Sequence, residues 1–239
     1  YDATQVSRLE HLIANTHLEA AQLQRAHGLV AAWREGRLSK YNHGREFEPD
    51  QNSLPARFVL VVDQTFGDAS IRYGMANAAS FQRMLEAALD EYPDIPVVLK
   101  MHPEVFAGRK QGHFDALTLG QASRVQILGR DVHAPCLLER AEAVYTVTSQ
   151  MGFEALLWGK PVRTFGMPFY AGWGLTQDEL KAPTRRCQVS LEALVHAALV
   201  DYPRYVDPET GQRCEVERVM AYLAFQRRMR QRFPEVMHA

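Results

Sequence analysis

Four polar segments in a chain of 239 residues contain side chains that could bind a phosphate and transfer a group. They span residues 63–70, 100–104, 148–154 and 166–174. Each follows an apolar run rich in β-branched residues, the composition expected of strands buried on both faces. Ligands of open parallel sheets bind outside the carboxyl ends of the strands. The four segments are therefore predicted to meet at one edge of a sheet.

Asp68 lies in the first segment, in a glycine-containing loop with Gln64, Thr65 and Ser70. A carboxylate held among polar neighbours can act as a base or as a nucleophile. The alternative is a structural role, in which Asp68 or Ser70 caps the next helix. The loop alone does not decide between these two roles.

His102 ends the second apolar run, close to Lys100 and directly before Pro103. An imidazole in this position could donate to a phosphate and stabilise a leaving group. The alternative is a histidine hydrogen-bonded at a strand end, ahead of a helix that Pro103 opens and whose dipole Glu104 favours. For an isolated His-Pro pair the structural alternative is favoured. The expected convergence with the other segments supports the functional one.

The last two segments carry a helix start and two aromatic rings. Ser149 suits the N-cap of a helix, which places Gly152 near the third helical position, where glycine costs ~0.5–1 kcal/mol relative to alanine. Either close approach of a ligand to the helix start or packing against a strand would explain that glycine. Glu154 could accept hydrogen bonds from ribose hydroxyls or complement the helix dipole. Tyr170 and Trp173 could flank a base or a sugar, or could serve only as packing.

Alternation of strands and helices predicts the sheet that must hold these segments. Strands are expected at 58–62, 96–101, 124–128, 143–148 and 161–165, and helices within 5–37 and at 76–92, 134–141, 150–158, 190–201 and 213–233. Such alternation gives right-handed βαβ units, so we predict an α/β fold, a Rossmann-like parallel sheet with helices on both faces. This domain is expected over residues 55–202. A helical connector and linker at 1–54 and a C-terminal helical segment at 203–239 are expected to flank it.

The composition is that of an ordinary globular protein. Hydrophobic residues make up 46% and charged residues 23% of the chain, and the net charge is −1, so neither nucleic acid nor an anionic surface is the expected partner. Cys136, Cys187 and Cys214 lie far apart, which argues for a reducing compartment. No apolar run approaches the ~18–20 residues of a membrane span, and no signal-peptide pattern is present.

No metal site is expected. His102, His113 and His133 are spaced too widely for a helical pair, and neither an HExxH nor a DxD motif occurs. The dinucleotide-binding glycine fingerprint, the P-loop and the Gly-x-Ser-x-Gly elbow are also missing from the sequence. These observations favour a metal-independent mechanism and disfavour a dinucleotide oxidoreductase.

Long stretches of the chain resemble the capsule-polysaccharide Kdo transferases of the KpsC type. The similarity is carried by residues 61–70 (VVDQTFGDAS), 100–104 (KMHPE), 147–162 (VTSQMGFEALLWGKPV), 165–176 (FGMPFYAGWGLT) and 38–42 (LSKYN). It runs over nearly the whole chain, and its motifs are long, which makes it specific.

The resemblance implies one half of a GT-B-like fold in a retaining, metal-independent glycosyltransferase. Such an enzyme transfers Kdo from CMP-β-Kdo onto the poly-Kdo linker of a capsular polysaccharide lipid anchor. By this resemblance Asp68 is the nucleophile of a double displacement and His102 contacts the CMP phosphate. The donor nucleotide is expected to contact Gln64, Thr65, Ser70, Lys100, Ser149, Gln150, Gly152, Phe153 and Glu154. Sugar or base contacts are expected of Arg72, Tyr170 and Trp173, and Arg72 and Lys100 are candidates for binding the Kdo carboxylate.

The resemblance also implies partners. Enzymes of this type carry another Rossmann-like domain with a Glu-Asp-Gly motif ahead of the helical segment, and no Glu-Asp-Gly occurs here. We therefore expect the donor-binding half of a module, with an N-terminal acceptor domain absent from this chain. A nucleotide-sugar donor, a glycolipid acceptor, a cytoplasmic location and peripheral association with the inner membrane are the further expectations.

Two alternatives stay open at this point. One is a transferase that uses another CMP- or CDP-linked donor, such as a sialyltransferase-like enzyme. The other is a non-catalytic nucleotide-binding domain in which Asp68 is only a helix cap.

Overall fold

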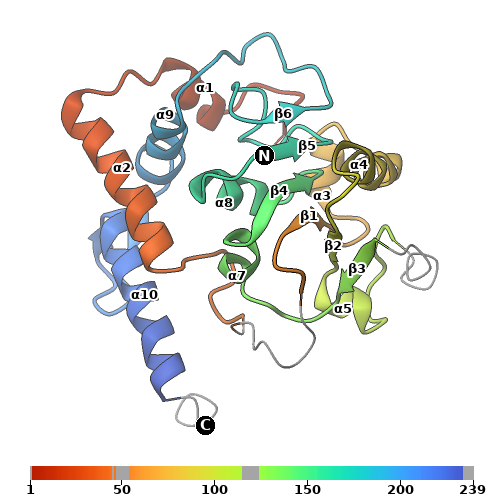
Figure 1. Ribbon diagram of the computed structural model, residues 1–239. Helices are drawn as coiled ribbons and strands as arrows, with labels where there is room; N and C mark the ends of the chain where they lie inside the picture. The colour runs from red at the N-terminus through yellow and green to blue at the C-terminus, as the bar shows by residue number, and fades with distance from the viewer. Residues whose placement is uncertain (1, 45, 47–53, 115–123, 234–239) are drawn as a thin grey trace.

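A six-stranded parallel sheet forms the centre of the protein (Figure 1). The computed structural model describes residues 2–44, 46, 54–114 and 124–233. The strand order is β3-β2-β1-β4-β5-β6, and every neighbouring pair in this sheet is parallel. The strands are β1 Phe58–Val62, β2 Val97–Lys100, β3 Val125–Leu128, β4 Ala141–Thr146, β5 Val162–Thr164 and β6 Gln177–Asp178. The predicted Rossmann-like sheet is thereby confirmed.

The central strand β1 shows why its sequence is an unbroken apolar run. Side chains of a strand alternate between the two faces of a sheet. Phe58, Leu60 and Val62 enter one hydrophobic layer, whereas Val59 and Val61 enter the other, and all five are buried. A strand that is covered on both faces has no polar position, and this produces the FVLVV pattern.

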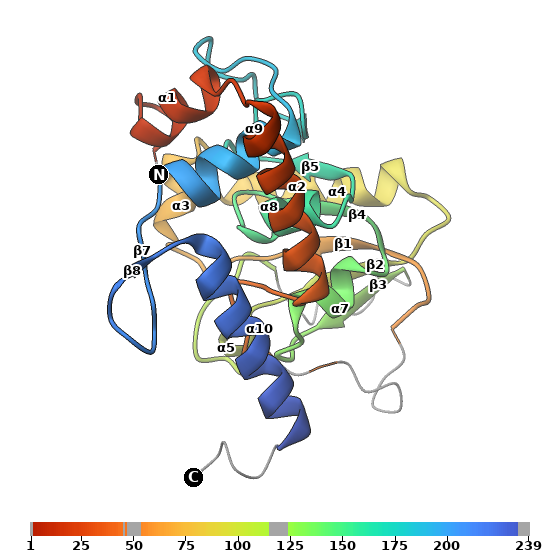
Figure 2. The same cartoon turned by 90° about the vertical axis from the view of Figure 1, so that its left-hand side faces the viewer.

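Helices cover both faces of the sheet (Figures 1 and 2). One face is covered by α3 Ala69–Tyr73 and α4 Ala78–Glu91. The other face lies against α7 Ala134–Leu138 and α8 Met151–Leu157, with α2 Ala20–Glu35 and α9 Leu191–His196 packed outside them. The remaining elements are α1 Arg8–Asn15, α5 Pro103–Phe106, a π-helical turn Ala197–Asp201, the hairpin strands β7 Tyr205–Val206 and β8 Arg213–Cys214, and α10 Val216–Arg232.

The helical region expected within 5–37 consists of two helices, each with a capping box at its start. Ser7 and Glu10 form the first, and Glu19 and Gln22 form the second. In a capping box the two side chains satisfy each other's backbone N–H groups, which fixes where each helix begins. The break lies between Asn15 and Ala20.

The flanking helices share the main hydrophobic layer with the sheet. Leu29 of α2, Phe58 of β1 and Met220 of α10 belong to the same buried cluster. Arg34 of α2 donates to the Leu157 carbonyl at the end of α8. The division into 1–54, 55–202 and 203–239 stays a prediction, but the described parts of all three ranges contribute to one core. None of the helices in the described part of the chain has the length and apolar composition to cross a bilayer.

Candidate functional site

The loops that follow β1 and β4 meet at the carboxyl edge of the sheet. These two strands are neighbours, and the connections run outward from them in opposite directions, to β2 and β3 on one side and to β5 and β6 on the other. Such a switch point leaves a crevice at the strand ends, which is where open α/β sheets bind ligands. The segments singled out in the sequence at 63–70 and 148–154 flank this point.

The amide of Gln64 joins the two loops. Its Oε1 accepts from the Thr148 backbone N–H at 2.9 Å, and its Nε2 donates to the Thr148 hydroxyl at 3.0 Å. The same Nε2 lies 3.2 Å from Ser70 Oγ and 3.4 Å from Asp68 Oδ2. Ser70 and Thr148 hydroxyls are themselves 3.0 Å apart. Gln64 is only 7% exposed, so its hydrogen bonds to Thr148 are shielded from competing water.

Asp68 is presented by a tight turn over Thr65–Asp68. The Asp68 N–H donates to the Thr65 carbonyl at 3.2 Å, and Gly67 has φ = 80°. A positive φ at the third residue is the requirement of a type II turn, and glycine meets it without strain. The Asp68 side chain is exposed, and its Oδ1 accepts from the Ser70 N–H at 2.9 Å, which caps α3. The structural role considered for Asp68 is therefore present, and its carboxylate still faces solvent at the carboxyl edge of the sheet.

Lys100 and His102 lie at the end of β2, next to the end of β1. The Asp63 N–H donates to the Lys100 carbonyl at 2.9 Å, which holds the two strand ends together. Burial lowers the pKa of the Lys100 ammonium, and Asp131 opposes that shift. The pKa of His102 is also lowered, first by burial. His102 Nδ1 accepts from the Glu104 N–H at 3.2 Å, so the proton of the neutral ring belongs on Nε2, ready to donate to an anion.

Two residues that the sequence analysis did not select also belong to this edge, Asp63 and His113. Asp63 is 6% exposed, and its Oδ1 accepts from the backbone N–H groups of Gln64 at 2.8 Å and His113 at 3.4 Å. Its Oδ2 is buried and has no partner among the described residues. Burial raises the pKa of Asp63 to about 6. The signal that could have identified it is an acid placed directly after a fully apolar strand.

The helix start after β4 differs in detail from the prediction. Gln150, not Ser149, occupies the N-cap position, although Ser149 Oγ accepts from the Met151 N–H at 3.3 Å. Gly152 faces the fully buried hydroxyl of Tyr170, with which a Cβ would overlap, and that hydroxyl donates to the Ser149 carbonyl at 2.5 Å. Packing against Tyr170 therefore explains the glycine without a ligand.

Tyr170 and Trp173 are not available for the sugar or base contacts expected of them. Both are 0% exposed and belong to the main hydrophobic cluster, where Trp173 Nε1 donates to the Phe169 carbonyl at 2.8 Å. Phe153 is also buried, at 2% exposure. These rings pack α8 and the loop after β5 against each other, which positions the helix start instead of touching its ligand.

Glu154 is likewise buried, at 2% exposure. Its Oε1 accepts from the Lys40 N–H at 3.0 Å, which brings the 38–42 motif onto α8, and its Oε2 has no partner among the described residues. Burial raises the pKa of this carboxyl. Arg72 and Gln150 are exposed, whereas Thr65 is half-buried. Among the residues selected from sequence, side-chain hydrogen bonds join Gln64, Asp68 and Ser70, and a backbone hydrogen bond joins Asp68 to Thr65.

One group in the described part of the chain has the geometry of a metal site. Ligand atoms of Glu46, His133 and Cys136 all lie within 4.8 Å of one another. Arg37 and Arg227 pair with the same Glu46 carboxylate, and Arg227 Nη1 is 2.9 Å from His133 Nε2. Although burial alone would raise it, the pKa of Glu46 is held at about 2 by the Cys136 thiol, Arg37 and His133. Two guanidinium groups at the ligand atoms repel a cation, so we assign the group to ion pairing of α10.

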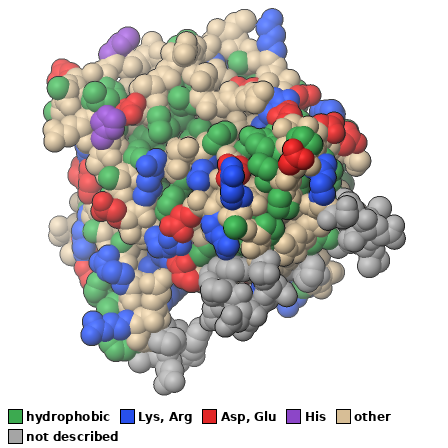
Figure 3. Space-filling view, viewed as in Figure 1, with side chains coloured by type: hydrophobic (Ala, Val, Ile, Leu, Met, Phe, Trp, Pro, Cys, Tyr) green, Lys and Arg blue, Asp and Glu red, His purple; other side chains and the backbone are tan. Residues whose placement is uncertain are grey.

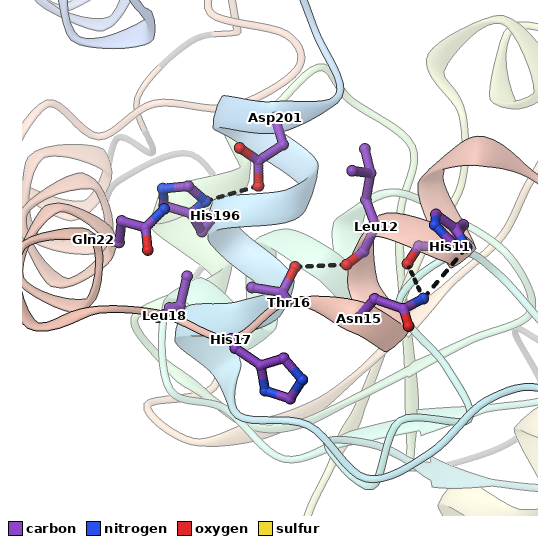
Figure 4. Close-up of a pocket in the computed structure, with 9 residues that line it drawn as sticks. All are labelled: His11, Leu12, Asn15, Thr16, His17, Leu18, Gln22, His196 and Asp201. Carbon is purple, nitrogen blue, oxygen red and sulfur yellow. Dashed lines mark hydrogen bonds and ion pairs between the residues drawn. The ribbon is translucent and has the colours of Figure 1, made fainter.

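A separate cavity of about 210 Å³ lies away from the strand ends (Figure 4). It is bounded by the end of α1, the turn into α2 and the π-helical turn, and its lining includes His11, Thr16, His17 and the His196–Asp201 pair at 2.8 Å. None of the residues selected from sequence lines it. Acidic and basic side chains are interspersed on the face seen in Figure 3, which shows no large area of one charge.

Sequence comparison finds relatives along almost the whole chain. A family model described as "Capsule polysaccharide biosynthesis protein" matches residues 3–205. The capsule polysaccharide modification protein LipA of Neisseria meningitidis serogroup A is 42% identical in an alignment of 234 residues that covers 94% of this chain and 33% of LipA. The lipopolysaccharide-processing protein LpsZ of Rhizobium meliloti is 35% identical over 231 residues, 95% of this chain and 52% of LpsZ. The chain thus spans between a third and about half of these curated relatives.

Two solved structures share the fold. One is Thermosulfurimonas dismutans KpsC, beta Kdo 2,4 transferase, with a TM-score of 0.83 and 37% identity over 93% of this chain and 69% of that chain. The other is the beta Kdo 2,7 transferase of the same KpsC, with a TM-score of 0.70 and 29% identity over 94% of this chain and 68% of that chain. The resemblance noted in the sequence is confirmed by both.

The Gly152–Tyr170 contact can be tested by Gly152→Ala. We expect a net loss of about 1–2 kcal/mol in the free energy of unfolding, because the added methyl overpacks a buried hydroxyl. Gly28→Ala is the matched control, since nothing lies within 4 Å of a Cβ at this exposed position of α2, and it should stabilise by ~0.5–1 kcal/mol. Urea unfolding measures both, and a stabilising Gly152→Ala would contradict the packing explanation.

The raised pKa of Asp63 predicts that the free energy of unfolding depends on pH. Its pKa is raised from 3.8 to about 6 in the folded protein, so the stability that it contributes is fully present below about pH 4 and is lost as the pH rises through about 6. Relative to Asp63→Asn, the wild type should lose roughly 1 kcal/mol between pH 5 and pH 7.5. Urea unfolding at both values checks this, with Asp90→Asn on the exposed face of α4 as control. A pH-independent difference between wild type and Asp63→Asn would show that the carboxyl does not titrate in this range.

Proposed function

The chain belongs to the capsule polysaccharide biosynthesis protein family, and we propose that it forms the donor-binding part of a retaining β-Kdo transferase. The observation that carries the proposal is the network centred on Gln64, which presents the exposed Asp68 carboxylate at the switch point of the sheet. The two Kdo transferase structures of KpsC, similar over more than nine-tenths of this chain, support the same class of reaction.

The donor in this proposal is CMP-β-Kdo. Nε2–H of His102 donates to the single phosphate, and Lys100 adds a positive charge from the same strand end. Both groups stabilise the charge that develops on the departing phosphate, as a preorganised anion site does. The hydroxyl of Ser149 and the exposed residue Gln150 approach the nucleotide from the β4 side. No metal is required in this scheme, because the phosphate charge is met by side-chain donors.

The transfer proceeds in two displacements. One oxygen of the Asp68 carboxylate attacks the anomeric carbon of Kdo, and the bond between that carbon and the phosphate oxygen breaks, its electron pair leaving with CMP. A hydroxyl of the acceptor then attacks the same carbon, the ester to Asp68 breaks, and the hydroxyl proton passes to a base. Two inversions give net retention of configuration. Arg72, which is exposed near the turn, is the candidate partner of the Kdo carboxylate.

The acceptor substrate and the cellular location of the reaction are part of the same proposal. The acceptor is the growing β-Kdo linker on a lipid, held by parts of the longer architecture that this chain does not span. The reaction takes place in the cytoplasm with peripheral association at the inner membrane. A CMP-sialic acid or CDP-alcohol donor would use the same phosphate groups, so donor profiling is the measurement that separates these substrates.

Donor selectivity is the first test. We expect CMP to raise the melting temperature of the chain more than UDP or ADP at equal concentration. His102→Ala should weaken CMP binding about tenfold by removing one charge-assisted hydrogen bond. The same variant should leave binding of cytidine, which has no phosphate, unchanged. Equal stabilisation by CMP, UDP and ADP would argue against a cytidine nucleotide donor.

The nucleophile is the second test. Incubation of the wild-type chain with CMP-β-Kdo should add the mass of one Kdo residue to the peptide that contains Asp68. In Asp68→Asn this adduct should fall to background, whereas CMP binding persists. Asparagine still caps α3, so loss of the adduct would not reflect loss of the helix. An adduct of undiminished yield in Asp68→Asn, or one located on another residue, would refute the assignment.

A further inference from the structure

Thr148 is the residue at which the loop after β4 meets α3 and the end of β1. Its side chain is buried, and the residue is 8% exposed. Its hydroxyl lies 3.0 Å from Ser70 Oγ, in the first turn of α3, and accepts from Gln64 Nε2 at 3.0 Å. Two polar groups that follow β1 thus share one hydroxyl that follows β4.

The orientation of the Gln64 amide follows from the backbone of Thr148. A backbone N–H can only donate, so the amide atom 2.9 Å from the Thr148 N–H must be the oxygen, Oε1. The amide nitrogen is then the atom that reaches Ser70 Oγ at 3.2 Å and Asp68 Oδ2 at 3.4 Å. One oxygen of the Asp68 carboxylate therefore lies next to a fixed N–H donor, while the other caps α3.

The methyl group of Thr148 lies in a space that two glycines leave open. A Cβ at Gly74, which ends α3, would be 2.4 Å from Thr148 Cγ2, and a Cβ at Gly166, in the loop after β5, would be 2.8 Å from it. Gly74 has φ = −89°, outside the left-handed region that favours glycine. Because Cγ2 and the hydroxyl share one Cβ, a methyl group confined in this way also fixes the direction of the hydroxyl.

The helix α3 has little stability of its own with which to hold Asp68 in place. It has five residues, fewer than an isolated helix needs in water, so contacts with other elements must fix it. Thr148 lies against both of its ends, at Ser70 in the first turn and at Gly74 at the C-cap. Asp68 is the N-cap of the same helix. The position of its carboxylate therefore depends on this buried threonine.

We propose that Thr148 is a positioning residue, whose hydroxyl holds the Gln64 amide and α3 so that the Asp68 carboxylate is aimed at the anomeric carbon of the donor. This inference rests on the proposed function of Asp68. Thr148 does not touch the donor in this scheme, because it is buried and its hydroxyl is directed to Gln64 and Ser70. Its contribution is to the geometry of attack, to which the rate of displacement is steeply sensitive.

Two substitutions separate the hydroxyl of Thr148 from its methyl group. Thr148→Val keeps a methyl group against the two glycines and removes the hydroxyl, whereas Thr148→Ser keeps the hydroxyl and removes the methyl group. We expect Thr148→Val to bind CMP within about twofold of wild type and to form the Kdo adduct on Asp68 roughly ten- to a hundredfold more slowly. Thr148→Ser should recover most of that rate.

Thr164→Val is the matched control. Thr164 is 0% exposed, and its hydroxyl donates to Asp178 Oδ1 at 2.8 Å, outside the network of Gln64. This variant should also lower the melting temperature, because it loses a buried hydrogen bond, but it should form the adduct at close to the wild-type rate. NMR follows the network directly: the side-chain NH2 group of Gln64 should exchange with water faster in Thr148→Val than in wild type, Thr148→Ser or Thr164→Val.

The outcomes distinguish the two proposals. If the wild type forms the adduct and Thr148→Val forms it equally fast, the role of Thr148 alone is overturned. Equal slowing in Thr148→Val and Thr164→Val, or a parallel loss of CMP binding and adduct in Thr148→Val, would assign Thr148 a purely structural role. If the wild type forms no adduct, the function proposed for Asp68 fails. Unchanged exchange of the Gln64 amide in Thr148→Val would then overturn the positioning contact as well, and faster exchange would support it.

Discussion

The side-chain amide of Gln64 is the interaction on which the candidate site depends. It follows β1, yet its two polar atoms bind the backbone and hydroxyl of Thr148, which follows β4. Parallel neighbours in a sheet are joined only by their backbone ladder, which ends with the strands, so the loops beyond would otherwise separate. A buried amide with its donor and acceptor both satisfied locks one arrangement of these loops. The turn with Asp68 and the start of α8 are thereby placed relative to each other.

Some of the buried polar atoms that lack a partner among the described residues lie near that junction, and others lie elsewhere, at Trp33 and Trp158. Asp63 and Glu154 each bury one carboxylate oxygen without a partner among the described residues, and His113 buries a ring nitrogen in the same way. Each such group costs about 1–3 kcal/mol of stability, which a purely structural sheet edge would avoid.

The strands and helices that alternate along the chain could be predicted from the sequence. The packing between segments that lie far apart in the sequence could not. Apolar runs such as FVLVV identify buried strands because a strand covered on both faces admits no polar residue. The two-residue strands β6, β7 and β8 carry no periodicity and were missed. Tyr170 and Trp173 resembled ligand contacts, because glycine- and proline-rich loops often border sites, whereas their burial depends on how the loop after β5 folds back. His113 gave no local signal, since its position depends on Asp63 and Phe81, which are distant from it in the sequence.

The cap that Asp68 provides for α3 has a consequence for the reaction cycle. A five-residue helix has almost no stability of its own, so the acceptor at its start contributes much of what holds it. In the covalent intermediate of the proposed reaction the carboxylate becomes an ester, which has no charge and is a weaker acceptor for the Ser70 N–H. Formation of the intermediate would therefore loosen α3, and its breakdown would restore the helix. The mobility of the adjacent surface, where the exposed rings of Phe66 and Tyr73 lie, would thus depend on whether Asp68 is a free carboxylate or an ester.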